Sequence, residues 1–309
     1  MSRKKLTPIC LILALVICIS GVAFASSAGK QGTNYDNFGK AVDEYTFSDL
    51  KKISNVKENI YNSMINSVDF YDAVEGSFTT TFIRAGEDVT IDFKVDIPQQ
   101  VAIESVRGSI ENLRSVCMDE MLYSYNASND DYIECYYASQ LDSSERSVKL
   151  DYNACLPHAQ KMAFFDGEKA IYDRVVTMAD GERGYYYRPD ITNTAYASQC
   201  IFPQSLGMAL LPDMDNWEIS GVRQCLGRQA VVISGAVTDP DYAKKISSDS
   251  FEMTVDMENG VLLEFKGFSG GELTQHIEMK NIHFLSSGAD NGIRSAAKSA
   301  LNVINHSTK

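Results

Sequence analysis

The sequence has few histidines and lacks the patterns that metal binding and phosphate binding require. Its four histidines are His158, His276, His283 and His306, and no two of them stand four residues apart. Two of these, seven residues apart on one expected strand, would face opposite sides. The sequence has no C-x-x-C pair, no glycine-rich phosphate loop and no complete calcium loop. We therefore expect no metal site and no cofactor.

One short motif could suggest catalysis. Residues 267–271 match G-x-S-x-G, in which a hydrolase serine sits between a strand and a helix. Here the residues after the motif alternate as in a strand, so a glycine-rich β-turn accounts for the same letters. Asp290 and His306 follow in the order acid then histidine, but they lie near the end of the chain. We expect no catalytic residue, and the protein is predicted not to be an enzyme.

Basic residues are scarce relative to acidic ones. The chain has 28 Lys and Arg against 41 Asp and Glu. Residues 1–25 contain three of the basic residues and no acidic one, so the remainder carries a formal charge of −16. A chain this acidic repels phosphate backbones and anionic lipid surfaces. Nucleic acid is therefore excluded as a partner.

Long apolar runs are absent except at the start of the chain. Basic residues at 3–5 precede an apolar stretch at 9–22, and small residues stand at 23 and 25. This arrangement predicts a signal peptide over 1–25, cleaved after Ala25. The alternative is an uncleaved anchor, but the run is shorter than the roughly 20 residues of a spanning helix. Ile17 before Cys18 disfavours a lipoprotein. We expect an extracytoplasmic protein, secreted or in the cell envelope and peripheral to a membrane at most.

Cysteines are few and widely spaced after the expected cleavage. In an oxidising compartment one or two disulfides are expected, and an odd count leaves at least one thiol free or paired between chains. Their spacing does not determine which pairs form. The five residues are Cys117, Cys135, Cys155, Cys200 and Cys225.

Helical periodicity appears in three places. Residues 26–47 are polar and glycine-rich, as in a flexible linker, and Ser48 is a candidate N-cap for the helix that follows. A second helical pattern covers about 106–125, and a terminal helix covers 293–304. The apolar stripe of the first helix consists of Leu50, Ile53, Val56, Ile60, Met64 and Val68.

Alternating apolar and polar residues dominate the rest of the chain. The clearest strand is 89–97, and Asn259-Gly260 supplies the positive φ angles of a hairpin turn. Residues 189–216 are less regular and are expected to cross one side of the sheet. The pattern predicts an α+β protein with an antiparallel sheet in one domain. Further strands are expected at 75–83, 132–139, 147–152, 170–178, 184–188, 229–237, 251–257, 261–268 and 272–284.

Three stretches resemble the LolA-like superfamily, which includes periplasmic lipoprotein carriers and RseB-type envelope sensors. They are the helix-to-strand segment 60–79, the strand before a proline at 90–98, and the strands of 217–262. The resemblance implies a LolA-like domain over 48–285, followed by a C-terminal helix and tail over 286–309. It also implies a strongly curved antiparallel sheet, or half-barrel, with helices covering its concave face.

In the carriers of this superfamily the concave face accepts acyl chains. The first hypothesis is therefore an exported protein that binds a hydrophobic ligand such as a lipid or a lipoprotein acyl chain. The alternative is an interaction protein that binds an envelope protein and regulates signalling, as an RseB-like sensor or an anti-sigma-factor partner. The same side chains could instead fill an ordinary core. The candidate lining residues are Phe78, Phe82, Phe93, Val95, Phe251, Val255 and Phe265.

Overall fold

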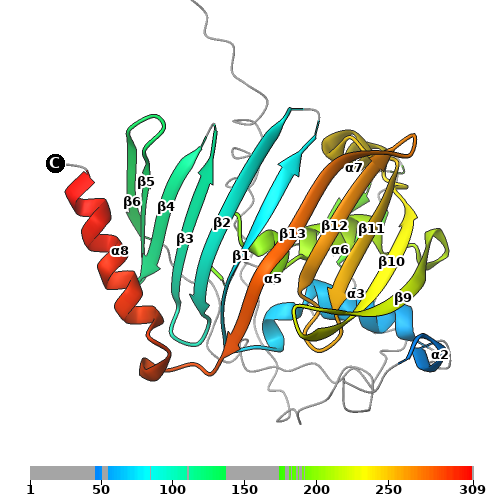
Figure 1. The fold of residues 1–309 in the computed structure, drawn as a ribbon, viewed down its shortest axis with the longest axis horizontal. Coiled ribbons are helices and arrows are strands. Elements are labelled where there is room, and N and C mark those ends of the chain that lie inside the picture. Colours follow the sequence, from blue (N-terminus) through cyan, green and yellow to red (C-terminus); the bar gives the residue numbers. More distant parts are fainter. Residues whose placement is uncertain are drawn as a thin grey trace, which may run out of the picture.

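Eleven antiparallel strands form one open sheet (Figure 1). The computed structural model describes residues 46–50, 55–83, 85–109, 111–136, 174–177, 181, 183–185, 187, 190 and 192–307. The strand order is β6-β5-β4-β3-β2-β1-β13-β12-β11-β10-β9, so the last strand pairs with the first and joins the two halves. The strands are β1 (Ala73–Phe82), β2 (Glu87–Asp96), β3 (Val101–Gly108), β4 (Asn112–Met118), β5 (Met121–Asn126), β6 (Asp131–Tyr136), β9 (Trp217–Cys225), β10 (Arg228–Ala236), β11 (Ser250–Asp256), β12 (Leu262–Ser269) and β13 (Glu272–Leu285). The predicted α+β class with an antiparallel sheet is confirmed.

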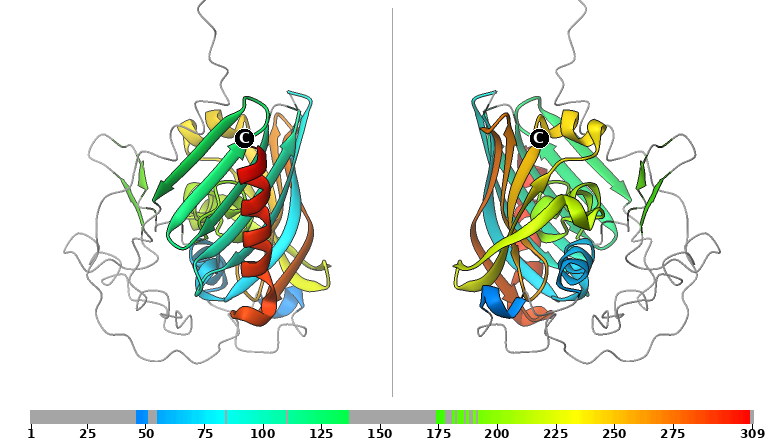
Figure 2. Two further views of the ribbon diagram at one scale, coloured as in Figure 1. Left: turned by 90° about the vertical axis from the view of Figure 1, so that its left-hand side faces the viewer. Right: turned by 90° about the vertical axis from the view of Figure 1, so that its right-hand side faces the viewer.

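The sheet curves around three helices on its concave face (Figure 2). These are α3 (Val56–Ile65), α5 (Ser198–Ile201) and α6 (Gln204–Leu210). The last two arise from the predicted excursion 189–216, and we call them the covering helices. Residues 197–211 are largely apolar and pack against the sheet away from water. Their buried backbone carbonyls need hydrogen-bond partners, which helical turns supply within the segment.

Shorter elements complete the described chain. A separate two-stranded ribbon pairs β7 (Val175–Thr177) with β8 (Arg183–Tyr185). Ser48 lies inside α2 rather than before it, so its prediction as an N-cap is wrong. The remaining elements are α2 (Phe47–Leu50), η2 (Ser67–Asp69), η5 (Met214–Asn216), α7 (Pro240–Ile246) and η6 (Ala289–Asn291).

The C-terminal helix α8 (Ile293–Ser307) packs on the opposite, convex face, over β3 and β4. The strand residues beneath it alternate with those that face the covering helices. Val101 and Val116 contact α8, whereas their neighbours Ala102 and Cys117 belong to the main core. Helices cover the concave face, as the resemblance implied, and α8 adds a helix on the convex face.

The helix predicted over 106–125 is wrong, because this segment forms β3, β4 and β5. Val106 and Leu113, seven residues apart as on two helical turns, are instead directly paired across a hairpin. The next hairpin turns at Asp119 and Glu120, whose φ angles of 53° and 63° suit a tight two-residue turn. Neither residue is a glycine or asparagine, so the usual turn signal is missing.

The G-x-S-x-G motif lies between two strands of the sheet. Residues 267–271 lead from β12 into β13, so the G-x-S-x-G motif is a hairpin turn and no helix follows it.

The four cysteines within the described residues are free, which contradicts the expected disulfides for these four; Cys155 lies outside the described residues. The expected signal peptide and the strand at 147–152 also lie outside them. In the described part of the chain, no helix is long and apolar enough to cross a bilayer.

Candidate functional site

Six of the seven predicted lining residues lie in one apolar cluster on the concave face. Phe78, Phe93, Val95, Phe251, Val255 and Phe265 are each at most 2% exposed. Phe82 is 39% exposed at the end of β1 and does not join them. The alternation of each strand places these side chains on the same face, as the register pairs of β1 with β2 show. Whether any of them contacts a ligand stays a prediction.

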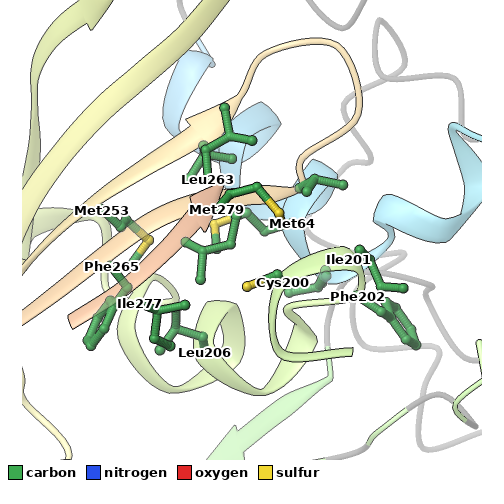
Figure 3. Close-up of a cluster of buried hydrophobic side chains, with 14 of the residues drawn as sticks. Met64, Cys200, Ile201, Phe202, Leu206, Met253, Leu263, Phe265, Ile277 and Met279 are labelled. Atoms are coloured by element: carbon green, nitrogen blue, oxygen red, sulfur yellow. The ribbon is translucent and has the colours of Figure 1, made fainter. Parts of the chain in front are cut away.

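The covering helices close the cluster over β11, β12 and β13 (Figure 3). Leu206 lies beside Ile277 and near Phe265, and Cys200 points toward Met279, whereas Ile201 and Phe202 lie further from these strand residues. The apolar cluster of the concave face is rich in methionine, whose unbranched and polarisable side chain fits irregular spaces. The buried methionines of this cluster are Met64, Met208, Met253, Met257 and Met279.

Buried polar groups hold α5 at both ends. At its start, the backbone N–H groups of Tyr196 and Ala197 donate to Glu104 Oε1 at 2.9 and 2.5 Å. At its end, the carbonyl of Ile201 accepts from Ser67 Oγ at 2.7 Å and from the hydroxyl of Tyr71 at 2.8 Å. The covering layer is therefore positioned by specific hydrogen bonds as well as by apolar contact.

Glu104 is the most unusual side chain of this face. It is 1% exposed, and within the described part of the chain its second oxygen, Oε2, is buried without a hydrogen-bond partner. Burial raises the pKa of Glu104 to about 7, and the nearby Asp190 adds to the shift, while the N–H bonds from Ala197 and Tyr196 oppose it. Burial likewise raises the pKa of Asp190 to about 6. Glu104 and Asp190, two carboxyl groups whose pKa values are raised, thus lie near each other beneath the covering helices.

Small side chains surround Glu104 on the concave face of β3, β4 and β5. Glu104 pairs across the sheet with Ser115, which pairs with Ser124, while Ala102 pairs with Cys117. We call these four residues, Ala102, Ser115, Cys117 and Ser124, the small-residue strip. The next residues of the same face, Leu113 and Leu122, are only partly buried. The strip lies toward the β6 edge of the sheet, away from the part of β12 that α5 contacts.

Glu104 and the strip were not predicted as site residues. The helix wrongly expected over 106–125 hid the strip, because helical spacing assigns different residues to one face. Alternation from Val101 and Ile103 would have placed Glu104 on the opposite face from these two. A charged residue at such a core position is a signal that the sequence did contain.

The convex face over β9 to β13 is polar and ion-paired. Burial would raise the pKa of Glu264, but bonds from Arg223, His276 and Lys266 outweigh it and lower the pKa to about 2. His276 Nε2 lies 2.9 Å from Glu264 Oε1, and Lys266 Nζ lies 3.1 Å from it. His276 is thus a hydrogen-bonding partner of Glu264 on a partly exposed face. Within the described residues, no three His, Cys, Asp or Glu side chains are grouped to hold a metal ion.

No family model matches the sequence, and no curated protein matches it significantly. Solved structures are similar in fold. The MucA/MucB complex of Pseudomonas aeruginosa matches at 12% identity and a TM-score of 0.37, over 77% of this chain and 60% of the matched chain. LprF of Mycobacterium bovis matches at 11% identity and a TM-score of 0.35, over 74% of this chain and 93% of that one.

A third match is an uncharacterized conserved protein of Thermus thermophilus, at 6% identity and a TM-score of 0.36. It covers 76% of this chain and 90% of the other. At these identities and TM-scores, the likeness does not bear on what this chain binds.

Proposed function

We propose that this protein is an exported, non-enzymatic binding protein for a hydrophobic ligand, such as a lipid or a lipoprotein acyl chain, in the cell envelope. One observation carries the proposal. Apolar side chains from both halves of an eleven-stranded sheet meet on one concave face, and that face is covered by short helices rather than by a second sheet. Phe93 and Val95 lie on this face beside the small-residue strip.

The chemistry of that face suits an alkyl chain. Small side chains on neighbouring strands leave the sheet surface low, so an alkyl chain could lie across them. Burial of an alkyl chain contributes about 0.8 kcal/mol per methylene. A ligand on the strip would contact Phe93 and Val95 at one side and Leu113 and Leu122 at the other.

The test is native mass spectrometry of the protein purified without detergent, followed by lipid extraction. Ser115→Trp fills the strip and should abolish the lipid adduct. Arg114→Trp, on the neighbouring residue, adds the same side chain to the opposite face and should retain it. An unmodified mass in the wild type, with no binding of added lipid, would refute the proposal.

A second candidate function is interaction with another envelope protein. The edge strand β6 favours it, since every residue of β6 is exposed and three are large and apolar or aromatic: Tyr132, Ile133 and Tyr136. An exposed edge can accept an extended segment of a partner through backbone hydrogen bonds. Glu134→Pro removes one outward-facing backbone donor from this edge, because the N–H groups of the alternate residues of β6 already pair with β5. It should weaken the capture of a membrane-anchored regulator without altering a lipid adduct.

A further inference from the structure

We propose that Glu104 is the polar anchor of the ligand site, and that it selects an alkyl ligand whose head carries a hydrogen-bond donor, such as an alcohol or an ammonium group. This inference rests on the proposed function and specifies its ligand class. A carboxylate head would be rejected at the same position.

The two oxygens of Glu104 have different roles. Oε1 accepts hydrogen bonds from the N–H groups of Tyr196 and Ala197 at the start of α5. These bonds fix the carboxyl group against the covering helices. Oε2 is fully enclosed and has no hydrogen-bond partner among the residues that the structure describes. A buried acceptor without a partner is costly, and proteins keep such groups chiefly where another molecule completes them.

The surroundings of Glu104 define what could complete it. Its neighbours across the sheet are Phe93 on β2 and Ser115 on β4, which lie on the same face. Within the part of the chain that the structure describes, no lysine, arginine or histidine forms an ion pair with Glu104. The ligand therefore meets an acceptor beside an aromatic ring and the small-residue strip.

Electrostatics set the sign of the ligand's head. Asp190 lies near enough to oppose the ionisation of Glu104, so the space already holds two acids. An anionic head would add a third negative charge where solvent is excluded. An ammonium head would neutralise one, and a hydroxyl would supply the missing donor at no cost in charge.

The experiment compares three ligands with the same alkyl chain by isothermal titration calorimetry: dodecanol, dodecylammonium and dodecanoate. Dodecanol is used below its solubility limit and the other two below their critical micelle concentrations. In wild-type protein at about pH 8, above the pKa of Glu104, the alcohol and the ammonium should bind at least about tenfold more tightly than the carboxylate, as a charge-assisted hydrogen bond implies.

Glu104→Gln keeps an oxygen for the two N–H groups and replaces the unpartnered acceptor with a donor. It should weaken dodecylammonium by about tenfold or more and strengthen dodecanoate. The matched control is Glu111→Gln, because Glu111 accepts from the hydroxyl of Tyr196 in the same covering segment. This control should leave the preference among heads unchanged.

The outcomes separate the two proposals. If none of the three ligands binds, the proposed function itself fails. If all three bind and the wild type does not discriminate among their heads, the function stands and the role of Glu104 is refuted. The wild-type series decides this point even if Glu104→Gln fails to fold, and circular dichroism shows whether it folds.

Discussion

The turn between β11 and β12 presses directly on helix α3, and Gly260 is the residue at the contact. Its φ angle is 72°, and a Cβ added there would lie 2.7 Å from the backbone nitrogen of Met64 and closer still to the carbonyl oxygen of Ser63. These are backbone atoms that no rotamer change can move. Gly260→Ala should therefore displace α3, which buries Ile60 and Ile65 in the main core.

The magnitude has two parts. A left-handed backbone costs an alanine about 1 kcal/mol relative to glycine. Overpacking against a fixed backbone adds about 2 kcal/mol. We expect Gly260→Ala to lower the free energy of unfolding by about 3 kcal/mol in urea denaturation followed by circular dichroism.

The matched control is Gly270→Ala in the β12–β13 turn. Gly270 has a φ angle of 59°, and an added Cβ would meet no atom within 4 Å. This variant should lose only the backbone part, about 1 kcal/mol. Equal losses in the two variants would show that α3 does not rest on the β11–β12 turn.

Three further predictions concern the site and its cover. Since the pKa of Glu104 rises from 4.5 to about 7 in the fold, the stability conferred by its neutral form is present at low pH and is lost as pH rises. Between about pH 4.5 and 7, the free energy of unfolding of the wild type should fall by about 3 kcal/mol, and that of Glu104→Gln should not show this fall. Urea denaturation at several pH values measures both. Phe265→Ala should cost about 4 kcal/mol by the same assay and Phe82→Ala about 1 or less, because only Phe265 is fully buried. The double variant Met64→Cys with Gly207→Cys should form a disulfide that joins α6 to α3, since a Cβ on Gly207 would lie 3.5 Å from the Cβ of Met64. The oxidised protein should melt at a higher temperature than the same protein reduced.

Local patterns predicted those elements whose burial follows from their own residues. The strand β2 alternates apolar and polar residues, and Gly260 in the turn after β11 has a positive φ angle of 72°, which suits glycine. The segment 106–125 failed because its turn at Asp119 and Glu120 uses positive φ angles without glycine. Without a turn signal, apolar residues on three short strands resemble a helical stripe.

Contacts between distant residues could not be predicted in this way. Glu104 meets the N–H groups of Tyr196 and Ala197, 92 and 93 residues further along the chain. Nothing near Glu104 in the sequence indicates these partners, and its burial follows only from the folded covering segment. The position of α8 on the convex face likewise depends on which face the covering helices already occupy.

The energetics of the covering layer indicate where a ligand could gain affinity. The six large apolar side chains of residues 197–211 are each buried, and at about 2 kcal/mol apiece they contribute about 12 kcal/mol; they are Ile201, Phe202, Leu206, Met208, Leu210 and Leu211. A dodecyl chain gains about 9 kcal/mol by the same measure. A ligand that displaced the covering helices would thus lose at least as much as it gained. Net affinity requires a ligand that lies beside them on the small-residue strip and completes Glu104, so Ser115→Trp and Glu104→Gln are the substitutions on which binding should depend most.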